Sequence, residues 1–344
     1  MSPRKSNPSK FHAEETTLNR RRFLALSCAC CAMSSFPISV QAVESPEIQS
    51  HLAAAKKAAG QDLGAYLKLG EIAAPTPGAV PTSPDALMKL PAPPPGKVFD
   101  NLYFVGSKWV SAWAITTSDG IILVDAMDND DEAEHIVDAG MRALGLDPAE
   151  IKMIVITHGH GDHYGGAGYL KTKYGPKLVM SGEDWTMVET KLEFDRPDWG
   201  RRPKREVVVE DGSVLKLGDT KIDVLLTPGH TLGTISLLFD VHEGTQTYRT
   251  MLWGGTAFNF GSQPDRMKRL QAYIDSTARA RDIAGKQNVS VFISNHSAYD
   301  EAVDKIEKMR AGGANPFIIG VDTTQRALTV MNECAQATML AWRT

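Results

Sequence analysis

Cysteine is scarce in this sequence. It contains four cysteines, and Cys28, Cys30 and Cys31 lie close together near the N-terminus, which leaves Cys334 alone in the rest of the chain. If the N-terminal segment is removed on export, no internal disulfide can form in the mature chain. A small scaffold held together by disulfides is therefore excluded.

An excess of basic charge is also absent. The chain has 37 Lys and Arg against 41 Asp and Glu, a formal net charge of -4, and its basic residues are scattered. Nucleic-acid-binding proteins usually carry a cluster of basic residues, which this sequence lacks, so a small-molecule partner is expected. With 344 residues, of which 42% are hydrophobic, the chain can bury the core of one large α/β domain or two ordinary ones. Nothing in the sequence indicates an oligomeric state.

Long apolar runs are nearly absent. The one such run, residues 23–43, is interrupted by Pro37 and directly follows Arg20, Arg21 and Arg22. A basic segment, a short apolar segment and a small-residue cleavage site in this order are typical of an export signal and not of a spanning helix. We therefore predict a signal peptide over residues 1–42, and no stable membrane association once it is removed.

The basic segment resembles the twin-arginine consensus of the pathway that exports folded proteins. Cleavage after Ala42 would release the mature protein into the periplasm. Two alternatives stay open: a chance basic run before a buried helix, and a lipoprotein anchored at Cys28, for which the preceding residues are a partial match. Because this pathway exports folded proteins, the chain could bind its metal before it leaves the cytoplasm.

The remaining chain divides by composition into two regions. Residues 43–97 contain a predicted helix (45–70) and a proline-rich strap (75–95), and residues 98–344 alternate strands with helices. Several consecutive strands are joined by turns too short for crossover helices, which predicts two mixed β-sheets between helices. Strands are predicted at 102–105, 109–116, 120–125, 151–156, near 207 and 214, and at 222–226, 235–239, 250–253 and 289–293, and helices at 130–144, 265–284, 300–310 and from 323.

One motif concentrates polar chemistry. The apolar strand 151–156 leads into a loop that carries His158, His160, Asp162 and His163. Burying so many titratable groups together is costly unless a cation binds them. Imidazole and carboxylate ligands suit catalytic zinc, and two adjacent metal sites can share one such loop. The alternative is a cluster of solvated surface histidines.

The loop reproduces the HxHxDH motif, and on it the chain resembles the metallo-β-lactamase superfamily from about residue 98 to the C-terminus. Two later histidines, His230 in a Thr-Pro-Gly-His-Thr segment and His296 after another strand, match further elements of the family. The resemblance implies an α/β fold, an αββα sandwich of two mixed sheets, with residues 98–344 as the catalytic domain. It also implies two zinc ions, one held by His158, His160 and His230, and the other by Asp162, His163 and His296.

One difference from the superfamily pattern indicates which subfamily the chain resembles. Glyoxalase-like, lactonase and phosphodiesterase members usually carry a Gly-Asp dipeptide whose Asp bridges both metals, and here Gly255 stands in place of that Asp. The third subclass of metallo-β-lactamases also lacks the bridging Asp and has His in the second site. Asn315, Pro316 and Phe317, before the final helix, are similar to that subclass as well.

The resemblance implies hydrolysis by a metal-activated hydroxide. We expect opening of a cyclic amide, most concretely a β-lactam, with Asp162 orienting the nucleophile as well as binding metal. The alternatives are a periplasmic hydrolase of another ester, lactone or amide, and a metal-binding protein without catalysis. An oxygen-reducing flavodiiron role is disfavoured because it needs extra carboxylates and a flavin domain.

Residues around the metal loop are predicted to support it or to contact substrate. Asp125, at the end of a strand, either lies under the loop or forms an ordinary turn, and Thr157 is a further candidate for fixing imidazole orientation. The aperiodic segment 191–205, with Arg201 and Arg202, either borders the pocket and binds a substrate carboxylate or is a solvated loop. Further candidates for substrate contact are Tyr164, Thr256, Asn259 and Asn295.

Overall fold

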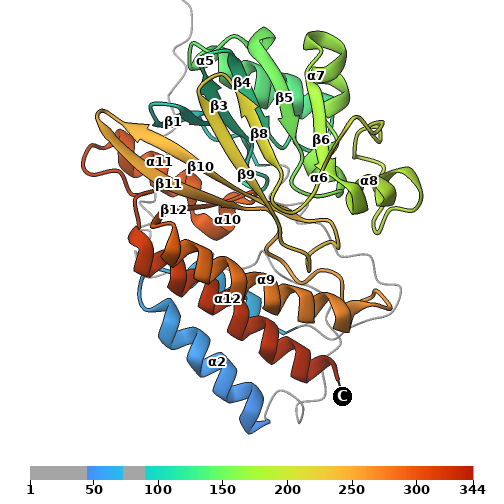
Figure 1. Ribbon diagram of the computed structural model, residues 1–344, viewed down its shortest axis with the longest axis vertical. Helices are drawn as coiled ribbons and strands as arrows, with labels where there is room; N and C mark the ends of the chain where they lie inside the picture. The colour runs from blue at the N-terminus through green and yellow to red at the C-terminus, as the bar shows by residue number, and fades with distance from the viewer. Residues whose placement is uncertain (1–44, 73–89, 344) are drawn as a thin grey trace, which may run out of the picture. The chain divides into compact units, whose positions relative to one another are not determined.

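The computed structural model describes residues 45–72 and 90–343, which belong to one compact unit (Figure 1). The predicted signal peptide and most of the proline-rich strap lie outside the described residues. Cys334, the free cysteine of the described part, is buried. None of the described helices combines the length and the apolar character that crossing a membrane requires.

The first sheet has seven strands in sequence order. Its first four strands pair antiparallel, whereas the fourth to the seventh pair parallel. The strands are β1 (Gly96–Phe99), β2 (Leu102–Phe104), β3 (Trp113–Thr117), β4 (Gly120–Val124), β5 (Ile151–Val155), β6 (Lys177–Ser181) and β7 (Val207–Val209).

The second sheet has five strands in the order β12, β11, β10, β9, β8. The pairs from β8 to β11 are antiparallel, and β11 and β12 are parallel. Both sheets are therefore mixed, as the short connections predicted. The strands are β8 (Val214–Leu217), β9 (Thr220–Leu226), β10 (Ile235–Glu243), β11 (Gln246–Trp253) and β12 (Val289–Ser294).

Helices cover the outer face of each sheet. The long helices α9 (Arg266–Lys286) and α12 (Gly320–Trp342) pack against the second sheet, and α2 (Pro46–Ala59) packs on α12 (Figure 1). Shorter helices share a core with the outer face of the first sheet, and a third core, with Phe104, Trp113 and Phe239, fills the space between the sheets. The predicted αββα sandwich is thus confirmed. The shorter helices on the first sheet are α4 (Asp130–Glu132), α5 (Ala139–Ala143), α6 (Gly161–Tyr164), α7 (Ala167–Tyr174) and α8 (Gly182–Glu189), with the segments η2 (Ala133–Asp138) and η3 (Pro148–Glu150). Helix α10 (Ser297–Asp300) contacts β12, α11 (Ala302–Arg310) contributes to the core between the sheets, and the 3₁₀ segment η1 (Gly64–Gly70) packs with α12.

Some element boundaries differ from prediction. The helix predicted over residues 45–70 ends at Ala59, because Gly60 adopts a φ of 57°, and continues only as the 3₁₀ segment η1. The helix predicted over residues 130–144 is interrupted by a π-helical segment, η2. Strands β1 and β6 were not predicted, although the turn signals Gly175-Pro176 and Ser181-Gly182 flank the five residues of β6.

The strand order brings several loops to one edge of the sandwich. β4, β5 and β6 run parallel in the first sheet, and β9 and β11 each pair antiparallel with β10, so they share the direction of β12. Loops that follow strands of one direction meet at the same edge, where α/β sheets commonly place their sites. The histidines of the predicted metal centre all follow such strands: three follow β5, with His163 in the short helix α6, and His230 and His296 follow β9 and β12.

Candidate metal centre

Asp125 lies directly under the metal loop. Its carboxylate accepts hydrogen bonds from the backbone N–H of Thr157 (2.8 Å) and from the Thr157 hydroxyl (2.9 Å), and its side chain is fully buried. The same carboxylate accepts from His163 Nδ1 at 2.8 Å. Of the two predicted roles for Asp125, the structure therefore supports the one that holds the metal loop.

The first group of donors consists of His158, His160 and His230. One ring nitrogen of each lies within 4.8 Å of the others. His158 Nδ1 donates to the carbonyl of Gly254 at 2.8 Å, and His230 Nδ1 donates to the carbonyl of Ala257 at 2.7 Å. Because a carbonyl only accepts, both rings carry their proton on Nδ1 and a lone pair on Nε2.

These two lone pairs face each other. The Nε2 atoms of His158 and His230 are 3.0 Å apart, a distance at which two acceptors repel unless a cation lies between them. Burial, followed by the nearby histidines, holds the pKa of both rings well below its usual range. The rings are therefore neutral, the state in which imidazole binds a metal.

The second group consists of Asp162, His163 and His296. His296 Nδ1 donates to the carbonyl of Trp109 at 3.1 Å, and its Nε2 lies 3.2 Å from His163 Nε2. The Asp162 carboxylate faces both rings, at 3.5 Å from His163 Nε2 and 3.8 Å from His296 Nε2. Burial lowers the pKa of His296 to about 4, so this ring too is neutral.

The donor set fits zinc. The six residues named from the sequence are brought together, and they offer imidazole nitrogens and one carboxylate, which are ligands that zinc prefers in catalytic sites. Asp162 is the most exposed of the second group, with 14% of its side chain accessible, whereas His163 and His296 are 0% and 6% accessible. A molecule from solvent therefore meets this carboxylate first.

Gly255 is packed against the first donor group. A Cβ atom at this position would lie 2.7 Å from Cβ of His230, closer than two side chains approach. Its carbonyl accepts from Trp253 Nε1 at 2.8 Å, which holds the backbone in place. An aspartate bridging both groups is thus absent from the end of β11 and would not fit there without movement of His230.

Two residues that the sequence did not indicate reach the first donor group. Glu193 Oε2 accepts from His160 Nε2 at 3.1 Å, which leaves His160 Nδ1 to face a metal. Arg269 pairs with Glu193 and donates to the carbonyl of His230 at 3.0 Å. Burial raises the pKa of Glu193, but His160 and Arg269 outweigh it and lower this pKa to about 2.

A third unpredicted residue, Asp184 at the start of α8, ties two loops together. Its carboxylate accepts from the N–H of Gly159 (2.8 Å), from the Thr231 hydroxyl (2.7 Å) and from the N–H of Gly233 (3.0 Å). The metal loop and the loop of His230 are thus fixed relative to each other. Asp184 and Arg269 lie in helices and Glu193 in a loop, and none of them belongs to a local motif, so no pattern in the chain singles them out.

Several of the residues predicted to contact substrate are buried in the structure. Tyr164 is 1% exposed and packs in a core, and Asn295, fully buried, donates to Thr157 and to the Gly254 carbonyl. Neither side chain is accessible to a substrate: Asn295 supports the metal loop from within, and Tyr164 packs in the core on the outer face of the first sheet. In the segment 191–205, Arg202 pairs with Asp195 at 3.1 Å. Of the other two residues predicted to contact substrate, Thr256 is buried and Asn259 is half-buried.

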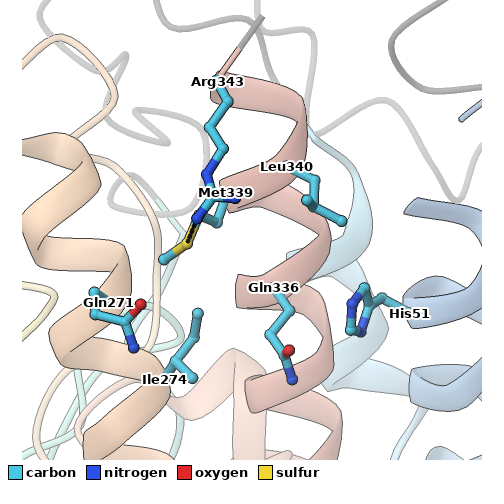
Figure 2. A pocket seen from close by; sticks show the side chains of 7 residues that line it. All are labelled: His51, Gln271, Ile274, Gln336, Met339, Leu340 and Arg343. Carbon is cyan, nitrogen blue, oxygen red and sulfur yellow. Dashed lines mark hydrogen bonds between the residues drawn. The ribbon is translucent and has the colours of Figure 1, made fainter. Parts of the chain in front are cut away.

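The segment 191–205 also packs against the metal loop. The ring of Phe194 lies 5.0 Å from the ring of His160, and Trp199 lies against Gly161. By contrast, the cavity in Figure 2, of about 220 Å³, contains none of the six donors. It lies among α2, α9 and α12 and is lined by His51, Gln271, Ile274, Gln336, Met339, Leu340 and Arg343.

The fold and the donors together define the class of protein: an αββα sandwich with a candidate metal centre at one edge of its sheets. Solved structures of this class are similar to the chain. They include the subclass B3 metallo-beta-lactamase BJP-1 of Bradyrhizobium japonicum, at 27% identity and a TM-score of 0.61, covering 70% of this chain and 92% of that one. The metallo-beta-lactamase FEZ-1 of Legionella gormanii, at 21% identity and a TM-score of 0.62, covers 72% and 96%.

The sequence comparisons then name the family. Residues 110–243 match the model of the metallo-beta-lactamase superfamily, so the chain carries a domain of that superfamily, as its motif predicted. Curated relatives include hydroxyacylglutathione hydrolases of Rhodopseudomonas palustris, 35% identical over 35% of this chain and 39% of the relative, and of Xanthomonas axonopodis pv. citri, 31% identical over 46% and 53%. The match spans only about half or less of the length of these two relatives.

Proposed function

We propose that this protein is a hydrolase that holds two zinc ions and opens the ring of a cyclic amide, with a β-lactam as its substrate class. One observation supports the proposal: the six donors lie together, and no carboxylate bridges them from the end of β11, where Gly255 packs against His230. The likeness to BJP-1, described as a subclass B3 metallo-beta-lactamase, supports the same substrate class.

The chain's own residues define what the centre can do. When bound, zinc supplies Lewis acidity and lowers the pKa of water toward neutrality. Asp162 is ionised, since burial raises its pKa but His163 and His296 outweigh it and lower the pKa well below its usual range. It is also accessible to solvent, so it orients the attacking water toward the substrate carbonyl. The backbone carbonyls and carboxylates that bind the ring nitrogens hold the imidazoles in place during turnover.

A second candidate function is hydrolysis of a thioester or ester. The observation that favours it is the similarity to hydroxyacylglutathione hydrolases, which covers 35% of the chain in the first case and 46% in another. Against it stands the missing carboxylate at position 255, where glyoxalase-like members usually carry an Asp. Both candidates use the same donors, so only turnover separates them.

The test is the initial rate of ring opening of a carbapenem and a chromogenic cephalosporin by zinc-loaded mature protein. A chelator-treated sample is the control, and a hydroxyacyl thioester of glutathione is assayed in parallel. We expect rapid, chelator-sensitive opening of the β-lactams. Negligible β-lactam turnover with rapid thioester cleavage would support the second candidate, and zinc binding without any turnover would support a metal-binding protein.

We also propose that the protein acts in the periplasm, as the predicted signal over residues 1–42 indicates. Fractionation of cells that express the full chain should place the enzyme in the periplasmic fraction. Replacing Arg20 and Arg21 by Lys should retain the chain in the cytoplasm if the twin-arginine pathway exports it. Unchanged export would contradict this route.

A further inference from the structure

His160 donates its hydrogen bond from Nε2, whereas the other four imidazoles of the centre donate from Nδ1. His158, His230 and His296 each donate Nδ1 to a backbone carbonyl, whereas His160 donates Nε2 to the carboxylate of Glu193 at 3.1 Å. Both side chains are almost fully buried, at 4% and 8% accessible. A charged acceptor inside the protein fixes the orientation of an imidazole and strengthens its opposite nitrogen as a metal ligand.

Arg269 extends this contact to a second donor of the same group. Its guanidinium, 5% accessible, pairs with Glu193 and donates from another nitrogen to the carbonyl of His230 at 3.0 Å. A third nitrogen donates to Asp265, one helical turn earlier in the chain, at 3.1 Å. The planar guanidinium can make these contacts together, which an ammonium group at the same place cannot.

The network is confined to one donor group. The second group is held by separate partners, Asp125 for His163 and the carbonyl of Trp109 for His296. Glu193 comes from the loop after α8 and Arg269 from α9, so the two residues connect two elements that are distant in sequence to the histidines of the first group.

We propose that Glu193 and Arg269 are a positioning pair that sets the affinity of the first metal site, formed by His158, His160 and His230, independently of the second. This inference rests on the metal-binding part of the proposed function but not on the bond that is hydrolysed. Neither residue contacts a reacting atom; both act through His160 and His230.

The test measures zinc affinity with one site disabled at a time. His296→Ala leaves the first site to be measured, and His230→Ala leaves the second. Glu193→Gln is introduced into each background, and zinc affinity is measured by competition with a chromophoric chelator. We expect a 10- to 100-fold loss of affinity in the His296→Ala background, the usual effect of removing a ligand's hydrogen-bond partner, and less than a threefold change in the His230→Ala background.

A matched control makes the same chemical change in the same part of the chain. Glu189→Gln removes a carboxylate that pairs with Arg205 at the surface, and it should change neither affinity. Histidine ¹⁵N spectra of the zinc-loaded full chain give a second readout: the His160 signal should show a protonated Nε2, and Glu193→Gln should shift it while the His163 signal stays in place.

The outcomes separate this inference from the proposed function. Equal losses in both backgrounds, or no loss in either, would overturn the positioning role and leave the metal centre intact. If the parent chain bound no zinc, both proposals would fall. If Glu193→Gln does not fold by circular dichroism, Arg269→Lys is measured in the same backgrounds. Failure of both variants to fold in the presence of zinc would make the pair structural and overturn the inference.

Discussion

The ring of Trp199 lies against the backbone of Gly161 within the metal loop. A Cβ atom at Gly161 would come within 2.2 Å of that ring, and Gly161 does not adopt a positive φ that would require glycine. The absence of a side chain at Gly161 is therefore what allows the segment 191–205 to close over the loop. This contact places Glu193 and Phe194, six and five residues before Trp199, beside His160.

Gly161→Ala should separate the segment from the metal loop. We expect a loss of about 1–3 kcal/mol in the free energy of unfolding, measured by urea denaturation, because the added methyl overpacks the contact. Gly168→Ala in α7 is the control, since a Cβ there meets only Asp130 at 4.0 Å. Alanine should stabilise that helix by about 0.5–1 kcal/mol. A Gly161→Ala protein as stable as its parent would contradict the role of this contact.

Asp184→Asn should loosen the junction between the metal loop and the loop of His230. Asparagine has one acceptor oxygen, so its NH₂ group would face the N–H of Gly159 or of Gly233. We expect a loss of about 1–3 kcal/mol in thermal or chemical unfolding, because a buried donor is left unsatisfied. Glu183→Gln, at the neighbouring position on the surface side of α8, should have no effect. Equal stability of the two variants would argue against this role of Asp184.

Stability should fall as pH rises through the titration of Asp300. Burial raises the pKa of this carboxyl to about 7, from 3.8 in the unfolded chain. Between these values the folded state binds more protons than the unfolded state. Its free energy of unfolding therefore decreases with pH, by up to about 1.4 kcal/mol per pH unit.

The measurement compares Asp300→Asn with the parent chain by urea unfolding of metal-free protein between about pH 4.5 and 7, within the window between the two pKa values. The difference between the two curves isolates Asp300 because every other titrating group is shared. We expect the variant's stability to depend less steeply on pH. Parallel curves would show that Asp300 titrates alike in both states.

Zinc removal should destabilise the folded chain. The paired lone pairs of His158 and His230, 3.0 Å apart, repel one another without a cation. A ligand that binds only the folded state contributes about 2.7 kcal/mol per site at a hundred times its Kd. We expect a higher Tm in zinc than in chelator, and a smaller difference for His158→Ala. A Tm indifferent to zinc would contradict the metal centre.

Asp162→Asn should impair turnover more than stability. The substitution keeps the size of the side chain but removes the carboxylate that orients the nucleophile, so kcat should fall about a hundredfold or more. The measurement uses metal-replete enzyme, with zinc content determined for each sample. Unchanged kcat at full zinc occupancy would remove Asp162 from the catalytic role.

The αββα fold and four of the six donors could be predicted from local features of the chain, whereas His230 and His296 were named from the family resemblance. Alternating and uninterrupted apolar runs mark most strands, and three imidazoles and a carboxylate between His158 and His163, directly after a buried strand, indicate a bound cation. Strands β1 and β6 were missed, and the first half of β11 was left out of its predicted strand because it is rich in polar residues.

By itself, the sequence determined most of the strands, the long helices and the cluster of His158, His160, Asp162 and His163, because these are encoded in local patterns. Only the tertiary structure decided which acceptor each imidazole uses, that Glu193 and Arg269 serve His160 and His230, and that Asn295 faces inward. Glu193 is 33 residues from His160, and Arg269 is 39 residues from His230. Such pairs form through the packing of whole elements, and no periodicity in the chain records them.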